Sequence, residues 1–467
     1  MLWTDPTPAA ALAVRRTKLA NALGDTPALI VSGGVRARNY PANPYPFRGE
    51  SHFLYLVGRA LPGAALFVDG ARATLLLPKP EDDDALWHGA VPTFDELRAD
   101  TGVDEVVAID RAPELIGDRG ARVVTIPGHD EPTARWQSSV LGRAVVASSG
   151  ARVQGDDVRL ADAMIALRLV HDDAAVAQIR RAVEVTARGH RAGMAALKPG
   201  VREGVVRAAI EAEFIAAGMD PAYGSIVTTH GEVLHNHAHH HVIAAGDLLL
   251  VDAGAETAEG WASDVTRVWP ATGKFSATQR VLYELVLAAN RAAIGKARPG
   301  VRYRDLHVEA GRTLVRGLVD LGVLRGDVEG LVERGAYTLF FPHGVGHLLG
   351  LDVHDMEDLG DRAGYAPGRT RASRFGDAYL RLDRDLLAGM AVTIEPGFYQ
   401  VPAILENATL TAPFEKDLDR GKLARFSDVR GIRLEDDVLI TGSGAEILTR
   451  AIPIEAGAVE DAIGRAV

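Results

Sequence analysis

The alternation of apolar and polar positions divides the first third of the chain into helix-like and strand-like stretches. Apolar residues at helical spacing run through residues 9–23, and a polar, glycine-containing stretch at 150–157 suits a linker. Short apolar runs that predict strands lie between them, at residues 28–32, 64–68, 74–77, 105–109 and 123–126. Strands mixed with helices in this way are typical of an α/β domain, which we place at residues 1–155.

The rest of the chain, residues 156–467, contains an internal repeat. The tetrapeptide Pro-Gly-Val-Arg occurs at 199–202 and again at 299–302, an offset of 299 − 199 = 100 residues. Each copy is flanked by helix-like patterns, and strand-like patterns follow each set; the helical stretches are 183–197, 203–217, 281–297 and 303–318. This matched context predicts a duplicated half-domain, with a cleft between halves that both contribute ligands.

Two aspartates follow apolar runs that read as neighbouring strands. Asp252 lies at the end of the run in LLLVDAG (248–254), and Asp264 lies in WASDVTR (261–267), after a turn at Gly260. An antiparallel strand pair can present both carboxylates on one face. A single Asp in such a place is commonly a turn or capping residue, but two after apolar strand residues favour a shared site.

Two glutamates occupy similar positions further along. Glu395 stands at a strand end that Pro396 stops, and Glu435 lies in residues 431–436, which read as one strand. The two-residue period of a strand puts Arg433 on the same face as Glu435. There an arginine can orient a metal-bound carboxylate; a surface ion pair is the alternative interpretation.

Histidines gather in two places. His343, His347 and His354 lie close together among glycines, which let the backbone approach a site closely. A second group occupies residues 235–241. We single out His235, which follows Val-Leu just before the strand of Asp252, and interpret the other histidines of this group as a solvated, adventitious metal-binding loop.

The chemistry of these residues indicates a metallohydrolase. Four carboxylates and one imidazole form a hard, oxygen-rich set with enough ligands for two divalent ions: Asp252, Asp264, His347, Glu395 and Glu435. Two ions about 3.5–4 Å apart can bridge a hydroxide that attacks an amide at neutral pH. The chain has no cysteine and no GxSxG serine-hydrolase motif, so a cysteine or serine nucleophile lacks support. It also has no glycine-rich phosphate loop.

Composition excludes several partners. The net charge of −11 argues against a nucleic-acid partner. No run of 18 uncharged apolar residues occurs, so we expect no membrane span. The first residues show no basic segment before a short apolar run, so we predict no signal peptide and take the cytoplasm as the default location.

Several motifs resemble those of the pita-bread metallopeptidases, in the branch of aminopeptidase P and prolidase. They are DAG (252–254), SDVTR (263–267), HGVGHLLGLDVHD (343–355), TIEPGFY (393–399) and GIRLEDD (431–437), with YPFRGESHFLYLVG (45–58) similar to the N-terminal domain of that branch. The resemblance implies an α+β protein: a duplicated pita-bread catalytic domain at 156–467 after an α/β N-terminal domain. The spacing of the two aspartates, 264 − 252 = 12, is one longer than usual in the family, and we place the extra residue in the turn at 256–260.

The resemblance also implies a ligand set. Asp252 and Asp264 would hold the first metal ion, with Asp264 bridging. His347 and Glu395 would hold the second, with Glu435 bridging. The expected ions are two divalent metals, with manganese first and zinc or cobalt as competitors.

Roles in substrate binding and catalysis follow from the same resemblance. His343 and His354 would line the substrate site and stabilise the tetrahedral intermediate, and His235 would contact the scissile region. Glu395 would assist proton transfer beside the bridging hydroxide, with Arg433 as an orienting partner. The substrate would be a proline-containing peptide, and we expect a homodimer or higher homo-oligomer.

Two branches of the family stay open. The short path from His235 to Asp252 resembles aminopeptidase P, which removes the residue before proline from longer peptides. The 435 − 395 = 40 residues between Glu395 and Glu435 resemble prolidase, as does RLDRDLLAGM (381–390), in which Arg381 matches an arginine that grips the free carboxylate of a dipeptide. Less favoured alternatives are a non-catalytic pita-bread binding module, which would lose metal ligands, and a creatinase-like amidinohydrolase, which does not share the metal set.

Overall fold

The computed structural model describes residues 6–80, 84–147 and 153–463. They form two compact units: residues up to Val176 together with 356–363, and Ala177–Asp355 together with residues from Gly364 onward. The domain boundary at residue 155 stays a prediction, and residues 150–152 of the expected linker lie outside the described residues. No described helix is long and apolar enough to cross a membrane.

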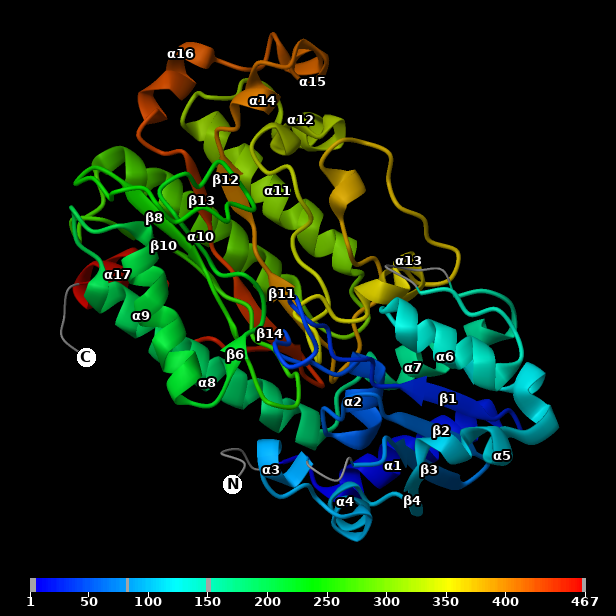
Figure 1. The fold of residues 1–467 in the computed structure, drawn as a ribbon. Helices are drawn as coiled ribbons and strands as arrows, with labels where there is room; N and C mark the ends of the chain where they lie inside the picture. The colour runs from blue at the N-terminus through cyan, green and yellow to red at the C-terminus, as the bar shows by residue number, and fades with distance from the viewer. Residues whose placement is uncertain (1–5, 81–83, 148–152, 464–467) are drawn as a thin grey trace. The chain divides into compact units, whose positions relative to one another are not determined.

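The first unit is built on a mixed sheet with the strand order β4-β3-β2-β1-β5. Its elements are α1 (Ala9–Leu23), β1 (Ala28–Val31), α2 (Ser51–Val57), β2 (Ala65–Asp69), β3 (Arg72–Leu77), α3 (Asp84–His88), α4 (Phe94–Thr101), β4 (Glu105–Ala108), α5 (Ala112–Ile116), β5 (Val124–Thr125), α6 (Glu131–Leu141) and α7 (Val158–Arg168). Figure 1 draws this sheet in blue and cyan. Every strand predicted from an apolar run is present, because Leu29, Phe67 and Leu76 belong to one buried cluster.

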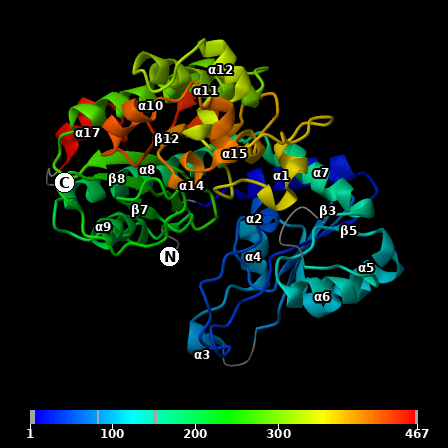
Figure 2. The same cartoon turned by 90° about the horizontal axis from the view of Figure 1, so that it is seen from above.

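The second unit contains the predicted duplication. Its main helices are α8 (Asp173–Ala196), α9 (Glu203–Ala216), α10 (Ala277–Lys296), α11 (Tyr303–Asp320) and α12 (Val328–Arg334), with short helices α14 (Pro402–Leu405), α15 (Ala408–Thr411), α16 (Arg420–Leu423) and α17 (Ala456–Ala462). The short helix α13 (Asp361–Gly364) belongs to the first unit except for Gly364. Its strands are β6 (Asp220–Pro221), β7 (Ile226–Thr228), β8 (Leu248–Asp252), β9 (Ala255–Glu256), β10 (Thr266–Pro270), β11 (Ala391–Ile394), β12 (Gly397–Tyr399), β13 (Gly431–Arg433), β14 (Asp436–Ile440) and β15 (Ala445–Ile447). In Figure 2, α9 lies on the side of β8 away from α10 and α11.

The two repeat turns make the same backbone contacts. Gly200 donates to the carbonyl of Ile243 (2.8 Å), and Gly300 donates to that of Leu386 (2.9 Å). β8 begins five residues after Ile243, and β11 begins five residues after Leu386 (248 − 243 and 391 − 386). Each turn therefore bears the same relation to a following strand, although the two strands start 391 − 248 = 143 residues apart rather than 100. Each half contributes one metal-binding candidate at a strand end: Asp252 or Glu395.

The strands around these residues pair in antiparallel fashion. β10-β8-β7 form one sheet and β11-β14-β15 another, with Asp252 opposite Thr266 in the first and Ile394 opposite Asp436 in the second. A backbone excursion separates β8 from β10, and a turn closes it where Gly260 donates to Thr257. The excursion keeps Asp252 and Asp264 in one site despite their long spacing.

Two predicted strands differ from the structure. Residues 431–436 form no continuous strand, because β13 pairs with β12 whereas β14 pairs with β11, so the chain changes sheets at Leu434 and Glu435. Asp264 lies two residues before β10 rather than within it. At both places a ligand candidate occupies the interruption, where backbone pairing does not fix the side chain's direction.

Candidate metal centre

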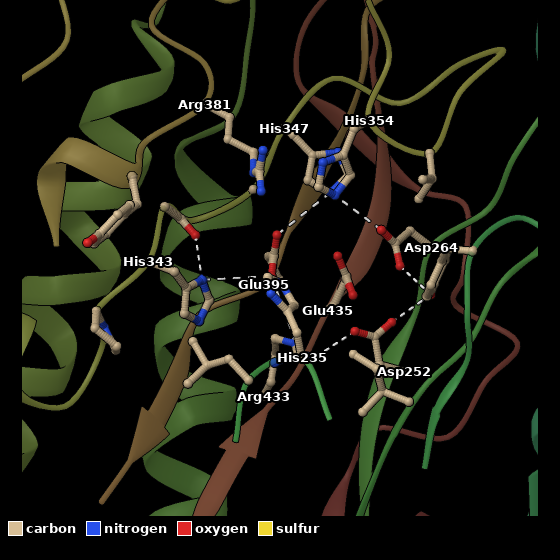
Figure 3. A pocket seen from close by; sticks show the side chains of 18 of the residues that line it. His235, Asp252, Asp264, His343, His347, His354, Arg381, Glu395, Arg433 and Glu435 are labelled. Carbon is tan, nitrogen blue, oxygen red and sulfur yellow. Dashed lines mark hydrogen bonds and ion pairs between the residues drawn. The ribbon is translucent and has the colours of Figure 1, made fainter. Parts of the chain in front are cut away.

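A cavity of about 610 Å³ lies within the second unit, and all ten predicted site residues line it. Figure 3 shows their side chains directed into a common space from strands and loops of both halves. The residues are His235, Asp252, Asp264, His343, His347, His354, Arg381, Glu395, Arg433 and Glu435. Residues that are up to 200 positions apart thus meet in one site.

The five predicted ligands form two overlapping groups. Asp252, Asp264 and Glu435 offer one oxygen each within 4.8 Å of one another, and so do the ligand atoms of His347, Glu395 and Glu435. Glu435 belongs to both groups. The predicted ligand set is therefore gathered as a divalent-metal site requires, with carboxylates and one imidazole as donors.

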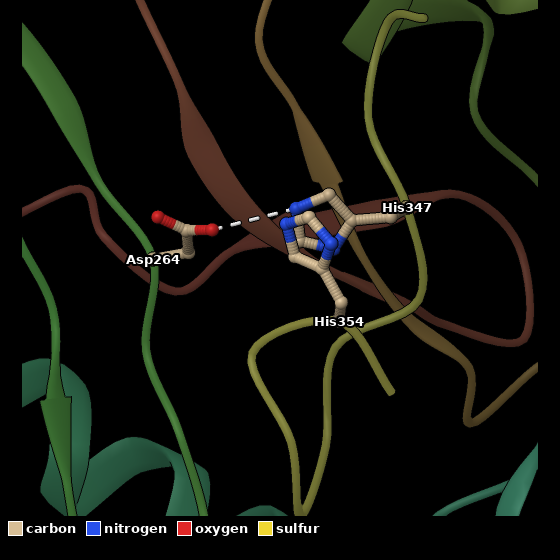
Figure 4. Close-up of side chains that lie close together, drawn as sticks. All are labelled: Asp264, His347 and His354. Carbon is tan, nitrogen blue, oxygen red and sulfur yellow. Dashed lines mark ion pairs between the residues drawn. The ribbon is translucent and has the colours of Figure 1, made fainter. Parts of the chain in front are cut away.

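A third group adds His354 to Asp264 and His347. The rings of His347 and His354 lie 4.0 Å apart between centroids, and His347 Nε2 lies 3.4 Å from Asp264 Oδ2. Figure 4 shows these three side chains together. His354, which the sequence assigned to the substrate site, stands close enough to Asp264 to compete with His347 as a ligand.

His347 is held in the form that a metal ligand needs. Its Nδ1 donates to the carbonyl of Leu348 (2.9 Å), and its backbone N–H donates to Thr393 Oγ1 (3.1 Å). A proton on Nδ1 leaves the lone pair of the ring on Nε2, and Nε2 is the atom that faces Asp264 and Glu395. Gly346 permits this approach, because a Cβ there would collide with the Thr393 carbonyl.

The carboxylates repel one another in a buried place. Burial raises the pKa of Asp264, with Asp252 adding to the shift, and it raises that of Glu435, with Asp264 and Glu395 adding. Burial also raises the pKa of Glu395, against the opposing charge of Arg433. Such a cluster is stable in its ionised form only with cations among the oxygens, so the residues present fit a metal centre.

Arg433 is the fixed cation of the site and is almost fully buried. Its Nη2 donates to Asp252 Oδ2 (2.5 Å), and its Nε donates to Thr266 Oγ1 (2.9 Å). The Thr266 hydroxyl in turn donates to Glu435 Oε2 (2.7 Å). The sequence predicted that Arg433 would accompany Glu435 directly; the structure links them through Thr266 and pairs Arg433 with Asp252.

The third arm of Arg433 reaches the substrate side of the cavity. Its Nη1 donates to the hydroxyl of Tyr399 (3.1 Å), which donates to His343 Nε2 (2.9 Å) because an arginine offers no acceptor. His343 Nδ1 donates to the Gly344 carbonyl (2.8 Å). Burial, with Arg433 nearby, lowers the pKa of His343 to about 3, so the ring is neutral.

Two further residues that support the ligand candidates were not predicted from the sequence: Tyr223 and Asp437. The hydroxyl of Tyr223 lies between Asp252 Oδ1 (2.6 Å) and Asp264 Oδ1 and shares its one proton between them, and the side chain lines the cavity. Asp437, fully buried, accepts from the Asp264 backbone N–H (3.2 Å) and from the Ser263 hydroxyl (2.8 Å). These contacts fix the segment that carries Asp264, and only the position of Asp437 beside Glu435 could have suggested it.

The histidine group at 235–241 lies in a loop in which His235, His237 and His240 are exposed, as the interpretation as a solvated loop expects, but parts of it reach the cavity and a buried carboxylate. His237 lines the cavity together with His235, and it lies near the backbone of Gly224. His241 contacts the fully buried carboxylate of Glu203 through Nδ1 (3.1 Å). Burial, with the charge of Arg433, lowers the pKa of His235. His240 has no place in the cavity lining.

A duplicated α+β unit with this buried carboxylate–histidine centre defines a metallopeptidase of the pita-bread fold. Residues 177–442 match metallopeptidase family M24, and residues 12–124 match the aminopeptidase P N-terminal domain. The chain belongs to metallopeptidase family M24, in its aminopeptidase P and prolidase branch.

Relatives and solved structures support this membership over nearly the whole chain. The chain is 31% identical to the Xaa-Pro dipeptidase of Homo sapiens over 460 residues, covering 95% of this chain and 91% of the relative. It is 32% identical over 467 residues to the "Probable Xaa-Pro aminopeptidase pepP" of Emericella nidulans, covering 96% of each. The solved structure of Pseudomonas aeruginosa aminopeptidase PepP superposes with a TM-score of 0.80 at 29% identity, covering 98% of this chain and 99% of that one.

Proposed function

We propose that the protein hydrolyses the peptide bond before proline and so releases the N-terminal residue of Xaa-Pro peptides. The observation that carries this proposal is the meeting of Asp252, Asp264, His347, Glu395 and Glu435 in one cavity with four further histidines and Arg381. Relatives named Xaa-Pro dipeptidase and Xaa-Pro aminopeptidase support the substrate class.

Two divalent ions suit the charge of the site. The four carboxylates of the ligand groups carry a charge of −4 when ionised, which two divalent ions balance and one does not. Asp252, Asp264 and Glu435 would hold one ion, and His347, Glu395 and Glu435 the other. Bound ions would activate a water molecule and polarise the scissile carbonyl. Manganese as the native metal and a homodimer or higher homo-oligomer stay predictions.

Glu395 is the residue we assign to proton transfer. Its side chain is partly exposed to the cavity, so it could take a proton from a water molecule there and return that proton to the leaving nitrogen. Arg433 Nε lies 3.9 Å from Glu395 Oε2 and stabilises the ionised carboxylate.

His235, His343 and His354 would surround the peptide. His343 is neutral and fixed by Tyr399 and Gly344, so it offers a rigid, uncharged wall. His354 stands next to His347, where the reacting carbonyl would lie, and would stabilise the oxygen of the tetrahedral intermediate. His235 would contact the scissile region from the opposite loop.

A strict Xaa-Pro dipeptidase is the second candidate. Arg381 favours it, because a guanidinium in the cavity can pair with the free carboxylate of a dipeptide. A non-catalytic binding module is less suited to the chain, since all five ligand candidates are present and gathered.

Hydrolysis of a small peptide series tests the proposal. The purified protein, loaded with manganese, is offered Xaa-Pro, Xaa-Pro-Xaa, longer Xaa-Pro peptides and the corresponding Xaa-Ala peptides. We expect cleavage of the proline series with little cleavage of the alanine series. Equal rates on both series would make the protein a general aminopeptidase, and no cleavage of any would support the binding module.

A further inference from the structure

The carboxylate of Asp377 collects three donors from three elements of the second unit. Nε2 of His307 in α11 donates to Oδ1 (3.3 Å), as does the hydroxyl of Tyr337 (2.7 Å). Nε of Arg374 donates to Oδ2 (2.8 Å). Asp377 and His307 are almost fully buried. Burial opposes ionisation, but the bonds from His307 and Tyr337 outweigh it and lower the pKa of Asp377 to about 2.

The backbone next to Asp377 is also tightly packed. Gly376 has a φ of +82°, and a Cβ there would lie 2.5 Å from Cγ2 of Thr338. Arg374 also donates to the Glu333 carbonyl (2.7 Å) and to the Tyr337 hydroxyl (3.1 Å). Only glycine fits position 376, so the segment is pressed onto the turn that carries Tyr337.

The chain that leaves this anchor becomes a wall of the active-site cavity. Phe375, Tyr379 and Arg381 line it. Tyr379 is 55% exposed although it lines a cavity, as a side chain awaiting a ligand would be. A Cβ on Gly344 would lie 2.9 Å from Cα of Leu380, so the wall rests directly on the motif of His343.

A second path joins the same anchor to the site. The His307 ring lies 5.1 Å from that of Phe341, and Phe341 lies 4.8 Å from the ring of His343, edge to face. Asp377 thus fixes both the Phe375–Arg381 wall through the backbone and the His343 side through His307. None of these residues belongs to the metal-ligand groups.

We propose that Asp377, with His307, Tyr337 and Arg374, is a positioning device that sets the substrate-binding wall 375–381 without acting on the metal centre. Only the expected effect on KM rests on the proposed peptidase function. The expected effect on structure, a fixed backbone at residues 375–381, does not depend on the substrate. The wall side chains are the ones that contact the peptide, and the anchor acts through them.

Asp377→Asn tests the proposal because it keeps the size of the side chain and replaces an acceptor oxygen by a donor. We expect KM for Xaa-Pro peptides to rise about tenfold or more, with kcat changed less than about threefold and manganese affinity unchanged. Tyr337→Phe, which removes one donor, should give a smaller change in the same direction. Glu460→Gln is the matched control: Glu460 accepts from Lys274 and the Phe275 backbone, far from the cavity lining, so its loss should lower stability but leave KM unchanged.

Hydrogen–deuterium exchange supplies a readout that needs no activity. The amides of Tyr379 and Leu380 donate to the carbonyls of Gly376 and Asp377. They should exchange faster in Asp377→Asn, while β8 keeps its wild-type protection. Unchanged exchange over 374–381 overturns the proposal whatever the activity, and so does a parallel loss of manganese affinity. If wild-type protein cleaves no Xaa-Pro peptide, the proposed function is overturned, and the exchange result alone then decides whether Asp377 positions residues 375–381.

Discussion

Arg433 donates from Nη2 to the carboxylate of Asp252 at 2.5 Å, although 181 residues separate them in the chain. The same guanidinium holds Thr266 and Tyr399, so it fixes one metal-ligand candidate and the substrate-side His343 together. Because the planar guanidinium bonds three partners in three directions, the site depends on its geometry as well as on its charge.

Arg433→Lys should therefore lose activity even though the charge is retained. An ammonium group cannot reach Asp252, Thr266 and Tyr399 at once, so we expect kcat to fall about 10–100-fold, as when an outer partner of a metal ligand is removed. Steady-state kinetics of Arg433→Lys beside Arg433→Ala separates geometry from charge. A lysine variant with wild-type kcat/KM would show that only the charge matters.

Removing the metal should abolish hydrolysis and lower the thermal stability together. Without cations the buried carboxylates repel, so chelated protein should melt at a lower temperature than manganese-loaded protein. Added manganese should restore both the melting temperature and the rate. The measurement is differential scanning fluorimetry paired with a peptide assay, and full activity in protein verified as metal-free would contradict the metallopeptidase assignment.

The carboxylates shared between ligand groups should matter most. Asp264→Asn and Glu435→Gln each remove one charge from two of the groups, and we expect a loss of at least about 4 kcal/mol of transition-state stabilisation, roughly a thousandfold in kcat. His240→Ala is the control, since His240 lies outside the cavity lining, whereas His237 lines it. Near-native rates of the carboxylate variants at saturating manganese would show that the ligand assignment is wrong.

The sequence predicted those parts of the molecule that a local period encodes. The repeat of 100 residues carried through to α8–α9 and α10–α11, because both turns carry the same tetrapeptide before a helix start. Asp252, Glu395 and Glu435 lie at or just after a strand end, as the apolar runs predicted, whereas Asp264 precedes β10 and His347 lies in a loop. Residues whose role depends on distant partners were not predicted. Tyr223 bridges Asp252 and Asp264, which are 29 and 41 positions further along the chain, and no local pattern around Tyr223 indicates this contact.

The two errors have physical causes of the same kind. Residues 431–436 have the composition of one strand, but their neighbours in space are two different strands, β12 and β11, so the ladder breaks at Glu435. Asp264 was expected within a strand but lies two residues before β10. Its backbone N–H donates to the buried carboxylate of Asp437, a remote residue, instead of to a strand partner.

The first unit should lose stability on acidification through Asp358. Burial alone would raise the pKa of Asp358, but His52, with Nε2 at 3.1 Å, and the charge of Arg168 hold it below the ordinary range. An unfolded Asp titrates at about 3.9, so this carboxylate contributes stability above about pH 4 and loses it as the pH falls further. The urea midpoint of wild type should drop between pH 5 and pH 3.

Asp358→Asn should flatten that pH dependence, because its side chain does not titrate. Glu114→Gln is the control: Glu114 pairs with Arg111 at an exposed position of the same unit, where solvent screens the pair. The comparison requires equilibrium urea unfolding of the three proteins at each pH. An Asp358→Asn variant whose midpoint falls as steeply as that of wild type would place the acid sensitivity elsewhere.

We expect Arg381 to determine the length of peptide that the enzyme prefers. It lines the cavity, whereas Asp383 pairs with Arg302 and Asp385 with Arg369. A guanidinium makes a bidentate pair with a terminal carboxylate but not with an amide. If Arg381 grips the end of a dipeptide, wild type should favour Xaa-Pro over its C-terminal amide.

Arg381→Ala should then remove this preference by raising KM for Xaa-Pro about tenfold or more, while the amide and longer Xaa-Pro peptides change little. Arg369→Ala, which loses a surface pair with Asp385, is the matched control and should keep wild-type kinetics on both substrates. The four rates of wild type and Arg381→Ala on acid and amide form a cycle that isolates the guanidinium–carboxylate pair from other effects of the substitution. Unchanged dipeptide kinetics in Arg381→Ala would defeat the dipeptidase alternative, and efficient cleavage of long Xaa-Pro peptides by the same variant would identify an enzyme of the aminopeptidase P kind.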